Sequence, residues 1–343
     1  MKLPDQSQKV LSVAPNFEST QEIFDGIAHL VSYWNTKPFS FTSEELTRMI
    51  PGFDACVVWL DNLDSRAIHA GRQLKVIGIP RAGFDNVDVQ TATDLGIPVV
   101  YAPGANSTAV ADFTMGAIIT LTRSISFAAI SMKSGISPKR WALLTSPGFN
   151  LEGKKLGLLG LGNVGSRVAL RARSFGMEIM AYNSNLSLEK PTPIGLYPKE
   201  LGVELTDLEE LLKNSDIVSI HLPLNKSTTH LISGPELALM KKTAYLINVS
   251  RGQIIDERAL ISALRENRIA GAHLDVFENE PLPANSELRA FDNVLLTPHI
   301  AWCTADSIRK SNTMIAEAVA DILSGRSPNK NLVANPAVLS RVT

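Results

Sequence analysis

The sequence has few cysteines and almost no net charge. Only Cys56 and Cys303 occur among 343 residues, without a C-x-x-C spacing, which argues against a disulfide framework and against a metal site of the zinc type. We expect both thiols to be buried and inert. The 33 lysines and arginines balance 34 aspartates and glutamates, so the formal net charge is −1. This balance argues against nucleic acid or a membrane surface as a partner and favours a small molecule.

Long apolar runs, repeats and low-complexity segments are also absent from the sequence. No stretch approaches the ~18 uninterrupted apolar residues that a membrane span requires. The N-terminal stretch MKLPDQSQKVLSVAPN lacks the charged region followed by an apolar region that is typical of a signal peptide. Nothing repeats at a solenoid period. We therefore expect a cytoplasmic protein without a membrane partner.

Short apolar runs alternate with longer segments of helical period. The chain has 343 residues, 45% of them hydrophobic and 20% charged, which is enough for two globular domains. Apolar runs separated by helices are typical of parallel strands covered on both faces, and they predict a doubly wound α/β fold. The expected strands are 55–60, 74–79, 98–102, 155–160, 178–182, 217–222, 244–249, 269–276 and 293–298.

Two helical stretches bear on the domain organisation. Residues 107–135 contain no proline and predict one long, buried helix that bridges two domains or contacts a second subunit. Residues 305–324 predict the last helix, and the polar segment GRSPNKN follows it. We expect this last helix to return to the first domain, which makes that domain discontinuous in sequence.

The stretch LGLLGLGNVGSRVAL, residues 156–170, contains a G-x-G-x-x-G motif formed by Gly160, Gly162 and Gly165. The motif alone is weak, but an apolar run precedes it, and a helical stretch and a further strand follow it. In such a βαβ unit the three glycines permit a tight turn, a close approach of the backbone to a pyrophosphate, and close packing of helix on strand. We therefore expect dinucleotide binding at the positive end of this helix, with a purely structural turn as the alternative.

The residues that follow the 178–182 strand favour the cofactor that carries a 2′-phosphate, NADP(H). NAD-binding proteins usually place an acidic residue there to hold the ribose hydroxyls, whereas this chain has Asn183, Ser184 and Asn185. A carboxylate would repel a 2′-phosphate, while amide and hydroxyl groups can hydrogen-bond it. We expect a preference for NADP(H), or use of both NAD(H) and NADP(H). The alternative is that these are ordinary turn residues.

Three polar residues follow apolar runs further along the chain. Arg251 comes after LINVS, Glu280 after the run that ends near Val276, and His299 after NVLLTP. Because ligands bind at the carboxyl ends of strands in open parallel sheets, the three are candidates for one site. Taken singly, each has a structural alternative: an arginine in a surface salt bridge, a solvated glutamate, or a histidine that caps or packs.

The motifs together resemble the D-isomer-specific 2-hydroxyacid dehydrogenase family. GLGNVG, HLPLNKSTTHLI, NVSRGQIIDERAL, DVFENEPLP and TPHIA occur in the order and spacing of that family, and the resemblance extends from about Lys75 to Pro336. It implies that Arg251, Glu280 and His299 are the catalytic arginine, glutamate and histidine.

The chemistry of these three residue types suits reduction of a 2-keto acid. The planar fork of Arg251 can bind the substrate carboxylate and polarise the carbonyl. As hydride reaches the carbonyl carbon, His299 as an imidazolium can donate the proton, and Glu280 favours the charged form and fixes the orientation of the ring. In the oxidative direction neutral His299 is the base.

Dinucleotide contacts are expected at the glycine turn and at successive strand ends. By resemblance Asp275 holds the nicotinamide carboxamide, with a structural role at a strand end as the alternative. The expected contacts are Gly160, Gly162, Asn163, Val164, Gly165, Asn183, Ser184, Asn185, Leu222, Pro223, Val249, Ser250, Arg251, Asp275 and His299.

The resemblance places a substrate loop at VIGIPRAGFDNVD, residues 76–88, where backbone amides near Ala82 and Gly83 meet the substrate carboxylate. Arg81 departs from the glycine-richer loop of many relatives. It either adds positive charge at the mouth of the pocket, which favours small anionic substrates, or points to solvent. Trp302 is similar to its counterpart in members of the glycerate dehydrogenase or hydroxypyruvate reductase type, and its ring can narrow the pocket or stack against the other domain.

The sequence thus predicts an α/β oxidoreductase with an active-site cleft between two doubly wound domains. A Rossmann cofactor domain comprises 105–302, and a flavodoxin-like substrate domain comprises 1–104 and 303–343. The expected activity is NAD(P)H-dependent reduction of a small 2-keto acid such as glyoxylate or hydroxypyruvate, and the resemblance implies a homodimer formed through 107–135. Two alternatives stay open: a phosphite-type dehydrogenase, to which GFDN at 83–86 is similar, and an NAD(P)H-sensing, corepressor-like binding protein.

Overall fold

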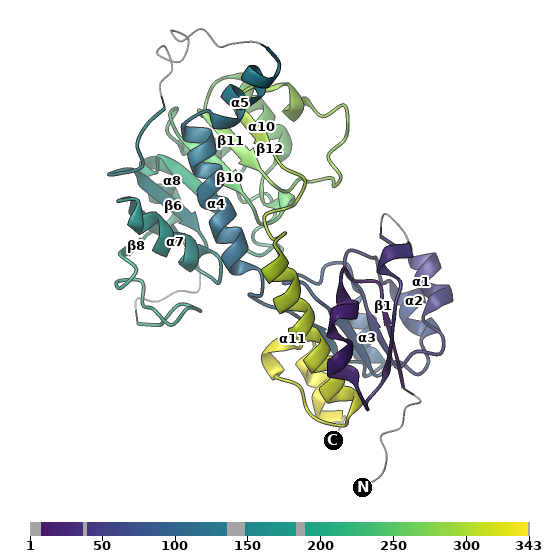
Figure 1. The fold of residues 1–343 in the computed structure, drawn as a ribbon. Helices are drawn as coiled ribbons and strands as arrows, with labels where there is room; N and C mark the ends of the chain where they lie inside the picture. Colours follow the sequence, from purple (N-terminus) through teal and green to yellow (C-terminus); the bar gives the residue numbers. More distant parts are fainter. Residues whose placement is uncertain (1–7, 37–39, 136–147, 183–188, 342–343) are drawn as a thin grey trace. The chain divides into compact units, whose positions relative to one another are not determined.

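The computed structural model describes residues 8–36, 40–135, 148–182 and 189–341. The chain divides into two compact units (Figure 1). Unit 1 comprises Met1–Asn106 and Cys303–Thr343, and unit 2 comprises Ser107–Trp302. Unit 1 is therefore discontinuous in sequence, because its last helix follows unit 2 in the chain.

Unit 1 contains a parallel sheet of five described strands in the order β2-β1-β3-β4-β5, which is the flavodoxin order. Adjacent residues of β3 belong to the cores on opposite faces of the sheet. Val57 packs with α11 on one face, and Cys56 packs with α1 and α2 on the other. The strands are β1 Lys9–Ser12, β2 His29–Ser32, β3 Ala55–Val57, β4 Val76–Ile79 and β5 Val99–Tyr101. The helices are η1 Phe17–Phe24, η2 Trp34–Thr36, α1 Ser43–Met49, α2 Ser65–Ala70, α3 Val89–Asp94, α11 Ala305–Leu323, η5 Lys330–Leu332 and η6 Pro336–Arg341.

Unit 2 contains a parallel sheet of seven described strands in the order β12-β11-β10-β9-β6-β7-β8. The order reverses between β6 and β9, as in a Rossmann sheet. The strands are β6 Lys155–Leu159, β7 Glu178–Tyr182, β8 Val203–Leu205, β9 Ile217–Ile220, β10 Tyr245–Asn248, β11 Gly271–Leu274 and β12 Val294–Leu296. The helices are α4 Ser107–Thr122, α5 Ile125–Lys133, α7 Gly165–Ser174, α8 Leu208–Asn214, α9 Gly234–Leu239, η3 Gly252–Ile254, α10 Glu257–Arg265 and η4 Glu287–Ala290.

Two cores cover the faces of the unit 2 sheet. Leu158 and Ile247 belong to the core under α4 and α7, whereas their chain neighbours Leu159 and Leu246 belong to the core under α8, α9 and α10. Since successive side chains of a strand point to opposite faces, a strand buried on both sides is apolar throughout. The prediction of two parallel-sheet α/β domains is therefore confirmed.

Short polar side chains cap the starts of several helices. Asp256 accepts a hydrogen bond from the Ala259 amide at the start of α10, and Asp207 does the same for Glu210 at the start of α8. Such caps satisfy amides that have no partner inside the helix. They fix where each helix leaves the end of a strand or loop.

The prediction of one long helix over 107–135 is wrong. The stretch forms α4 and α5, two helices bent by 70°, with Ser124 between them in the left-handed region at φ 50°. α4 is largely buried and packs on α7, β10 and β11 (Figure 1), whereas no residue of α5 is buried within the chain. Among the described residues no single helix is long and apolar enough to cross a membrane. The bent pair α4 and α5 reaches that length and apolar composition only when its two helices are counted together.

Within unit 1, the buried side chain of Asn335 joins the C-terminal segment to β5 and the residues before it. The Asn335 side chain accepts a hydrogen bond from the Val99 amide at 2.8 Å and donates to the Ile97 carbonyl at 2.9 Å. The two thiols differ from the prediction that both are buried: Cys56 is buried in β3, but Cys303 is exposed, because it lies in the turn that precedes α11 rather than in a strand.

Candidate active site

The glycine turn joins β6 to α7 at the point where the strand order reverses. Gly160 has a φ of +101°, and a Cβ there would lie 2.7 Å from the His221 carbonyl oxygen. A Cβ on Gly165 would lie 2.0 Å from the Gly160 carbonyl oxygen, so the helix starts in contact with the turn. A Cβ on Gly162 would meet nothing within 4 Å. The turn therefore leaves open space at the start of a helix, which fits a pyrophosphate.

His221 lies beside this turn and was not selected from the sequence. It follows β9 directly, its Nε2 lies 2.9 Å from the Ser219 hydroxyl, and its Nδ1 is buried without a hydrogen-bond partner among the described residues. Burial lowers its pKa to about 3, so the ring is neutral near pH 7. The sequence reasoning missed it because it lies inside the predicted strand 217–222.

The residues predicted to choose between the cofactors lie outside the described residues. Asn183, Ser184 and Asn185 fall in 183–188, directly after Tyr182, the last residue of β7. The preference for NADP(H) therefore stays a prediction.

Arg251 lies in a turn after β10 that is organised by a buried asparagine. The Asn248 side chain donates to the Arg251 carbonyl at 2.9 Å and accepts from the Ser250 amide at 3.1 Å and the Ser250 hydroxyl at 2.9 Å. The Arg251 guanidinium donates to the Ser250 carbonyl at 2.8 Å. Asn248 is fully buried, and the sequence reasoning did not identify it because it lies inside an apolar run.

The turn after β10 touches the loop that carries Glu280. A Cβ on Gly252 would lie 1.9 Å from the Phe277 carbonyl carbon, 2.0 Å from its oxygen and 2.5 Å from the Glu278 amide nitrogen. Only glycine permits this contact between two backbones. As a result, the turn of Arg251 and the loop of Glu280 are packed directly on each other.

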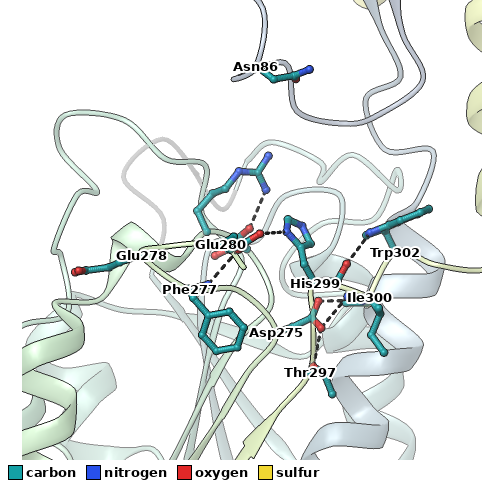
Figure 2. A network of polar contacts seen from close by, with 12 residues as sticks. Asn86, Asp275, Phe277, Glu278, Glu280, Thr297, His299, Ile300 and Trp302 are labelled. Carbon is teal, nitrogen blue, oxygen red and sulfur yellow. Dashed lines mark hydrogen bonds and ion pairs between the residues drawn. The ribbon is translucent and has the colours of Figure 1, made fainter. Parts of the chain in front are cut away.

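Glu280 and His299 form the central hydrogen-bonded pair of the site (Figure 2). His299 Nδ1 lies 2.7 Å from Glu280 Oε2, and Glu280 Oε1 accepts a hydrogen bond from the Phe277 amide at 3.1 Å. Burial pushes the pKa of Glu280 upward. The hydrogen bond and charge of His299, the Phe277 amide and the charge of Arg251 together outweigh burial and leave the pKa lowered. The carboxylate therefore stays ionised beside the imidazole.

His299 itself has a left-handed backbone with φ 53°, a conformation that is uncommon for a side chain of its size. The backbone of Asp275 accepts from the His299 amide at 2.8 Å, and the Trp302 indole donates to the His299 carbonyl at 2.8 Å (Figure 2). The conformation is therefore held by contacts on both sides of the residue.

The Asp275 carboxylate is fully buried and is bound by the same loop. It accepts from the Thr297 hydroxyl at 2.6 Å, the Ile300 amide at 2.9 Å and the Ala301 amide at 2.9 Å. Burial raises its pKa above the ordinary value, against the opposing effect of these hydrogen bonds and of the His299 charge. These contacts give Asp275 a structural role at the strand end, and its contact with the nicotinamide carboxamide stays a prediction.

The predicted substrate loop lies in unit 1 and is bound to its own neighbours. Arg81 donates to the Trp59 carbonyl at 3.1 Å and to the Asn86 side chain at 3.4 Å. Its charge also faces Asp61, a buried carboxylate that accepts from the Trp59 amide at 3.0 Å. The alternative in which Arg81 simply points to solvent is therefore not favoured. Ala82 is exposed and Gly83 half-buried.

A Rossmann sheet with a glycine turn and a paired histidine and glutamate at its strand ends defines the class of dinucleotide-linked oxidoreductases. Comparison with known families agrees, since the family model described as D-isomer specific 2-hydroxyacid dehydrogenase, NAD binding domain, matches residues 115–301. The chain belongs to the D-isomer specific 2-hydroxyacid dehydrogenase family and is an NAD(P)-linked oxidoreductase.

Curated relatives cover most of the chain. The chain is similar to the glyoxylate reductase of Thermofilum pendens, with 41% identity over 315 residues, 92% of this chain and 90% of that enzyme. It is also similar to the D-3-phosphoglycerate dehydrogenase of Methanocaldococcus jannaschii, with 40% identity over 87% of this chain but only 55% of that longer enzyme.

Solved structures with bound cofactor share the fold. An acyclic imino acid reductase in complex with NADPH and D-Arg matches with a TM-score of 0.80 and 26% identity, covering 95% of this chain and 99% of that one. A D-lactate dehydrogenase from Aquifex aeolicus complexed with NAD and lactic acid matches with a TM-score of 0.80 and 27% identity, covering 96% and 99%. The neighbours therefore include complexes of both cofactors.

Proposed function

We propose that this protein reduces a small 2-keto acid, of the size of glyoxylate or hydroxypyruvate, to the 2-hydroxy acid, which is the D isomer where C2 is chiral. The observation that carries the proposal is the 2.7 Å contact between His299 Nδ1 and Glu280 Oε2 at the strand ends of the cofactor-binding unit. Relatives named glyoxylate reductase support the substrate class. The dinucleotide supplies the hydride when it is bound. The residues of the chain supply the proton and bind the substrate carboxylate.

In this proposal His299 is the proton donor. With Nδ1 held by Glu280, Nε2 delivers a proton to the carbonyl oxygen as negative charge develops there. Glu280 stabilises the imidazolium before transfer and keeps the ring in one orientation afterwards. In the direction of oxidation the same Nε2, unprotonated, accepts the proton of the substrate hydroxyl.

Arg251 binds the substrate carboxylate in this proposal. A guanidinium offers two parallel N–H donors that match a carboxylate, and the adjacent carbonyl oxygen is polarised by the same charge. The side chain of Asn248 fixes the backbone on which Arg251 stands. Ala82 and Gly83 add backbone amides to the carboxylate, and Trp302 limits the size of the group at C3.

For the cofactor we propose that NADPH is preferred or that both forms are used. The support is the absence of a carboxylate from the stretch after Tyr182, where Asn183, Ser184 and Asn185 stand. The glycine turn with Asn163 and Val164, together with Leu222, Pro223, Val249 and Ser250, supplies the other contacts. Initial rates against each cofactor test the preference: the KM for NADPH is expected at or below that for NADH, and a clearly lower KM for NADH contradicts it.

For assembly we propose a homodimer that covers α5. This helix exposes large apolar side chains on more than one side: Ile125, Phe127, Ile130 and Met132. Soluble monomers rarely leave so much apolar surface uncovered. We infer that a second copy of the chain covers this helix.

Initial-rate assays test the proposed activity. The purified protein is given NADPH or NADH with glyoxylate, hydroxypyruvate, pyruvate or a bulky aryl pyruvate. We expect turnover with glyoxylate and hydroxypyruvate and much less with the aryl pyruvate, since in this proposal Trp302 limits the size of the substrate pocket. Saturable cofactor binding without turnover of any keto acid contradicts the proposal, and oxidation of phosphite is then the next assay.

A further inference from the structure

A fully buried histidine lies in the strand next to the one that leads to His299. His273 is 0% exposed in the middle of β11, and its ring packs against Phe113 of α4 with ring centroids 5.4 Å apart. Its Nε2 lies 3.0 Å from the Thr297 hydroxyl oxygen, and its Nδ1 is buried without a hydrogen-bond partner among the described residues. An apolar residue would fill such a strand position without leaving a polar nitrogen unpaired.

The hydrogen-bond directions in this network are determined by counting protons. The Thr297 hydroxyl has one proton and donates it to Asp275 Oδ1 at 2.6 Å. It must therefore accept from the neighbouring imidazole, which places the His273 proton on Nε2. Nδ1 then carries a lone pair, and burial lowers the pKa of His273 to about 4, which keeps the ring neutral near pH 7.

The network ends at the backbone of the proposed proton donor. Asp275 Oδ1 and Oδ2 hold the amides of Ile300 and Ala301 at 2.9 Å each, and the Asp275 carbonyl holds the His299 amide at 2.8 Å (Figure 2). These bonds fix the main chain on either side of a residue in the left-handed region, with φ 53°. A small rotation there would carry the imidazole away from Glu280, whose oxygen lies 2.7 Å from Nδ1.

We propose that His273 and Thr297 are positioning residues of this dehydrogenase. His273 donates to Thr297, Thr297 donates to Asp275, and the carboxylate, oriented in this way, holds the backbone on which His299 is presented to Glu280 and the substrate. Neither residue touches substrate or cofactor. The proposal rests on the proposed function of His299 as proton donor.

Paired substitutions separate this role from simple packing. Thr297→Val and His273→Leu remove the hydroxyl and the donor at nearly constant volume, whereas Thr297→Ser and His273→Gln retain them. We expect kcat for keto-acid reduction to fall about 10-fold to 100-fold in the first pair, because small displacements of a catalytic group carry costs of that size. The second pair should stay within about 3-fold of the wild type, and the KM for NADPH should stay within about 3-fold in all four variants.

Leu264→Ala is the control for lost stability. Leu264 is 2% exposed in α10, in the core on the other face of the sheet, so its truncation lowers the Tm without touching the network. We expect its kcat to be unchanged despite a larger fall in Tm. Wild-type kcat in Thr297→Val and His273→Leu, beside an inactive His299→Ala, would overturn the positioning role and leave the proposed function intact.

Histidine ¹⁵N spectra test the network without turnover. The chain has six histidines, few enough to assign by substitution. We expect His273 to carry its proton on Nε2, and Thr297→Val to shift the ring resonances of His299. A proton on Nδ1 of His273, or unchanged His299 resonances in Thr297→Val, would refute the proposal even if the protein turned over no keto acid.

Discussion

At the residue scale, the site is a small set of polar groups whose charge is stabilised by mutual contact. Glu280 keeps 37% of its side chain exposed, and burial of the remainder alone would favour its neutral form. The contacts with His299, the Phe277 amide and Arg251 reverse that tendency and lower the pKa of the carboxyl group. The lowered pKa of Glu280 is thus a property of the assembled site rather than of the residue alone.

Glu280→Gln tests this at the same scale. A group with a lowered pKa in the folded state stabilises the protein above its unfolded value, near 4.5, and that contribution is lost as the pH falls through the lower folded value. We therefore expect the Tm of Glu280→Gln to lie below that of the wild type at pH 6 to 7 and the gap to close below about pH 4. We also expect kcat to fall about 10²-fold, since the imidazole loses its orientation.

Thermal unfolding across this pH range, with kinetics at neutral pH, measures both effects. A Tm difference that grows toward acid pH would contradict the lowered pKa of Glu280. Unchanged kcat in Glu280→Gln would contradict the pairing with His299.

At the element scale, the site depends on how turns after adjacent strands touch each other. Gly252 lets the turn after β10 lie on the peptide between Phe277 and Glu278, so Arg251 and Glu280 are positioned by one backbone contact. Similar close approach joins Gly165 to Gly160 at the cofactor turn. These glycines are needed for proximity rather than for flexibility.

Gly252→Ala tests the contact between the two turns. Its Cβ would fall 1.9 Å from the Phe277 carbonyl carbon, so one backbone must move. We expect a loss of about 1–3 kcal/mol in the free energy of unfolding, the usual cost of overpacking, together with a fall in kcat. Gly116→Ala in α4 is the matched control, because a Cβ there meets nothing within 4 Å; it should stabilise the protein by about 0.5–1 kcal/mol.

Denaturant unfolding of both variants gives the two free energies. Equal stabilities for Gly252→Ala and the wild type would show that the turn can shift freely and that its contact does not position Arg251.

Much of the element scale could be predicted from sequence, and the exceptions have physical causes. The strand 178–182 was predicted at its observed bounds because an apolar run of that length is bounded by turn residues. Strands β1, β2 and β8 were not predicted, since runs of three or four residues with charged or histidine neighbours give too little periodicity. The break at Ser124 has no proline or glycine to mark it.

At the residue level the sequence predicted side chains that follow strands and missed those inside them. Arg251, Glu280 and His299 were selected because polar residues after apolar runs stand out. Asn248 and His273 were not, because each lies within an apolar run and only the three-dimensional neighbours reveal their partners.

At the whole-molecule scale, two units with separate cores share one chain. The order of strands in each sheet is that of a nucleotide-binding or flavodoxin-like fold, and α11 joins unit 1 although it follows unit 2 in sequence. Helix α5 has no buried residue within one chain. The proposed homodimer would cover its exposed apolar side chains.

Ile130→Glu tests the proposed dimer. Ile130 is 65% exposed on α5, so a charge there should prevent burial against a partner while leaving the fold of the unit intact. Light scattering after size exclusion should give about twice the 37.2 kDa chain mass for the wild type and the single chain mass for the variant. Leu95→Glu, an exposed apolar position in unit 1, should leave the dimer unchanged. A monomeric wild type would contradict the assignment of α5.

The most direct test of the account compares hydride transfer in the wild type and in His299→Ala at saturating NADPH and glyoxylate, with cofactor affinity measured in parallel by fluorescence titration. Both proteins should bind NADPH, because the glycine turn and the other strand-end contacts are retained. The burst of NADPH oxidation should occur in the wild type and be slowed by at least about 10²-fold in the variant, as expected for loss of a general acid. Equal rates of hydride transfer in the two proteins would contradict the claim that His299, paired with Glu280, is the proton donor of this enzyme.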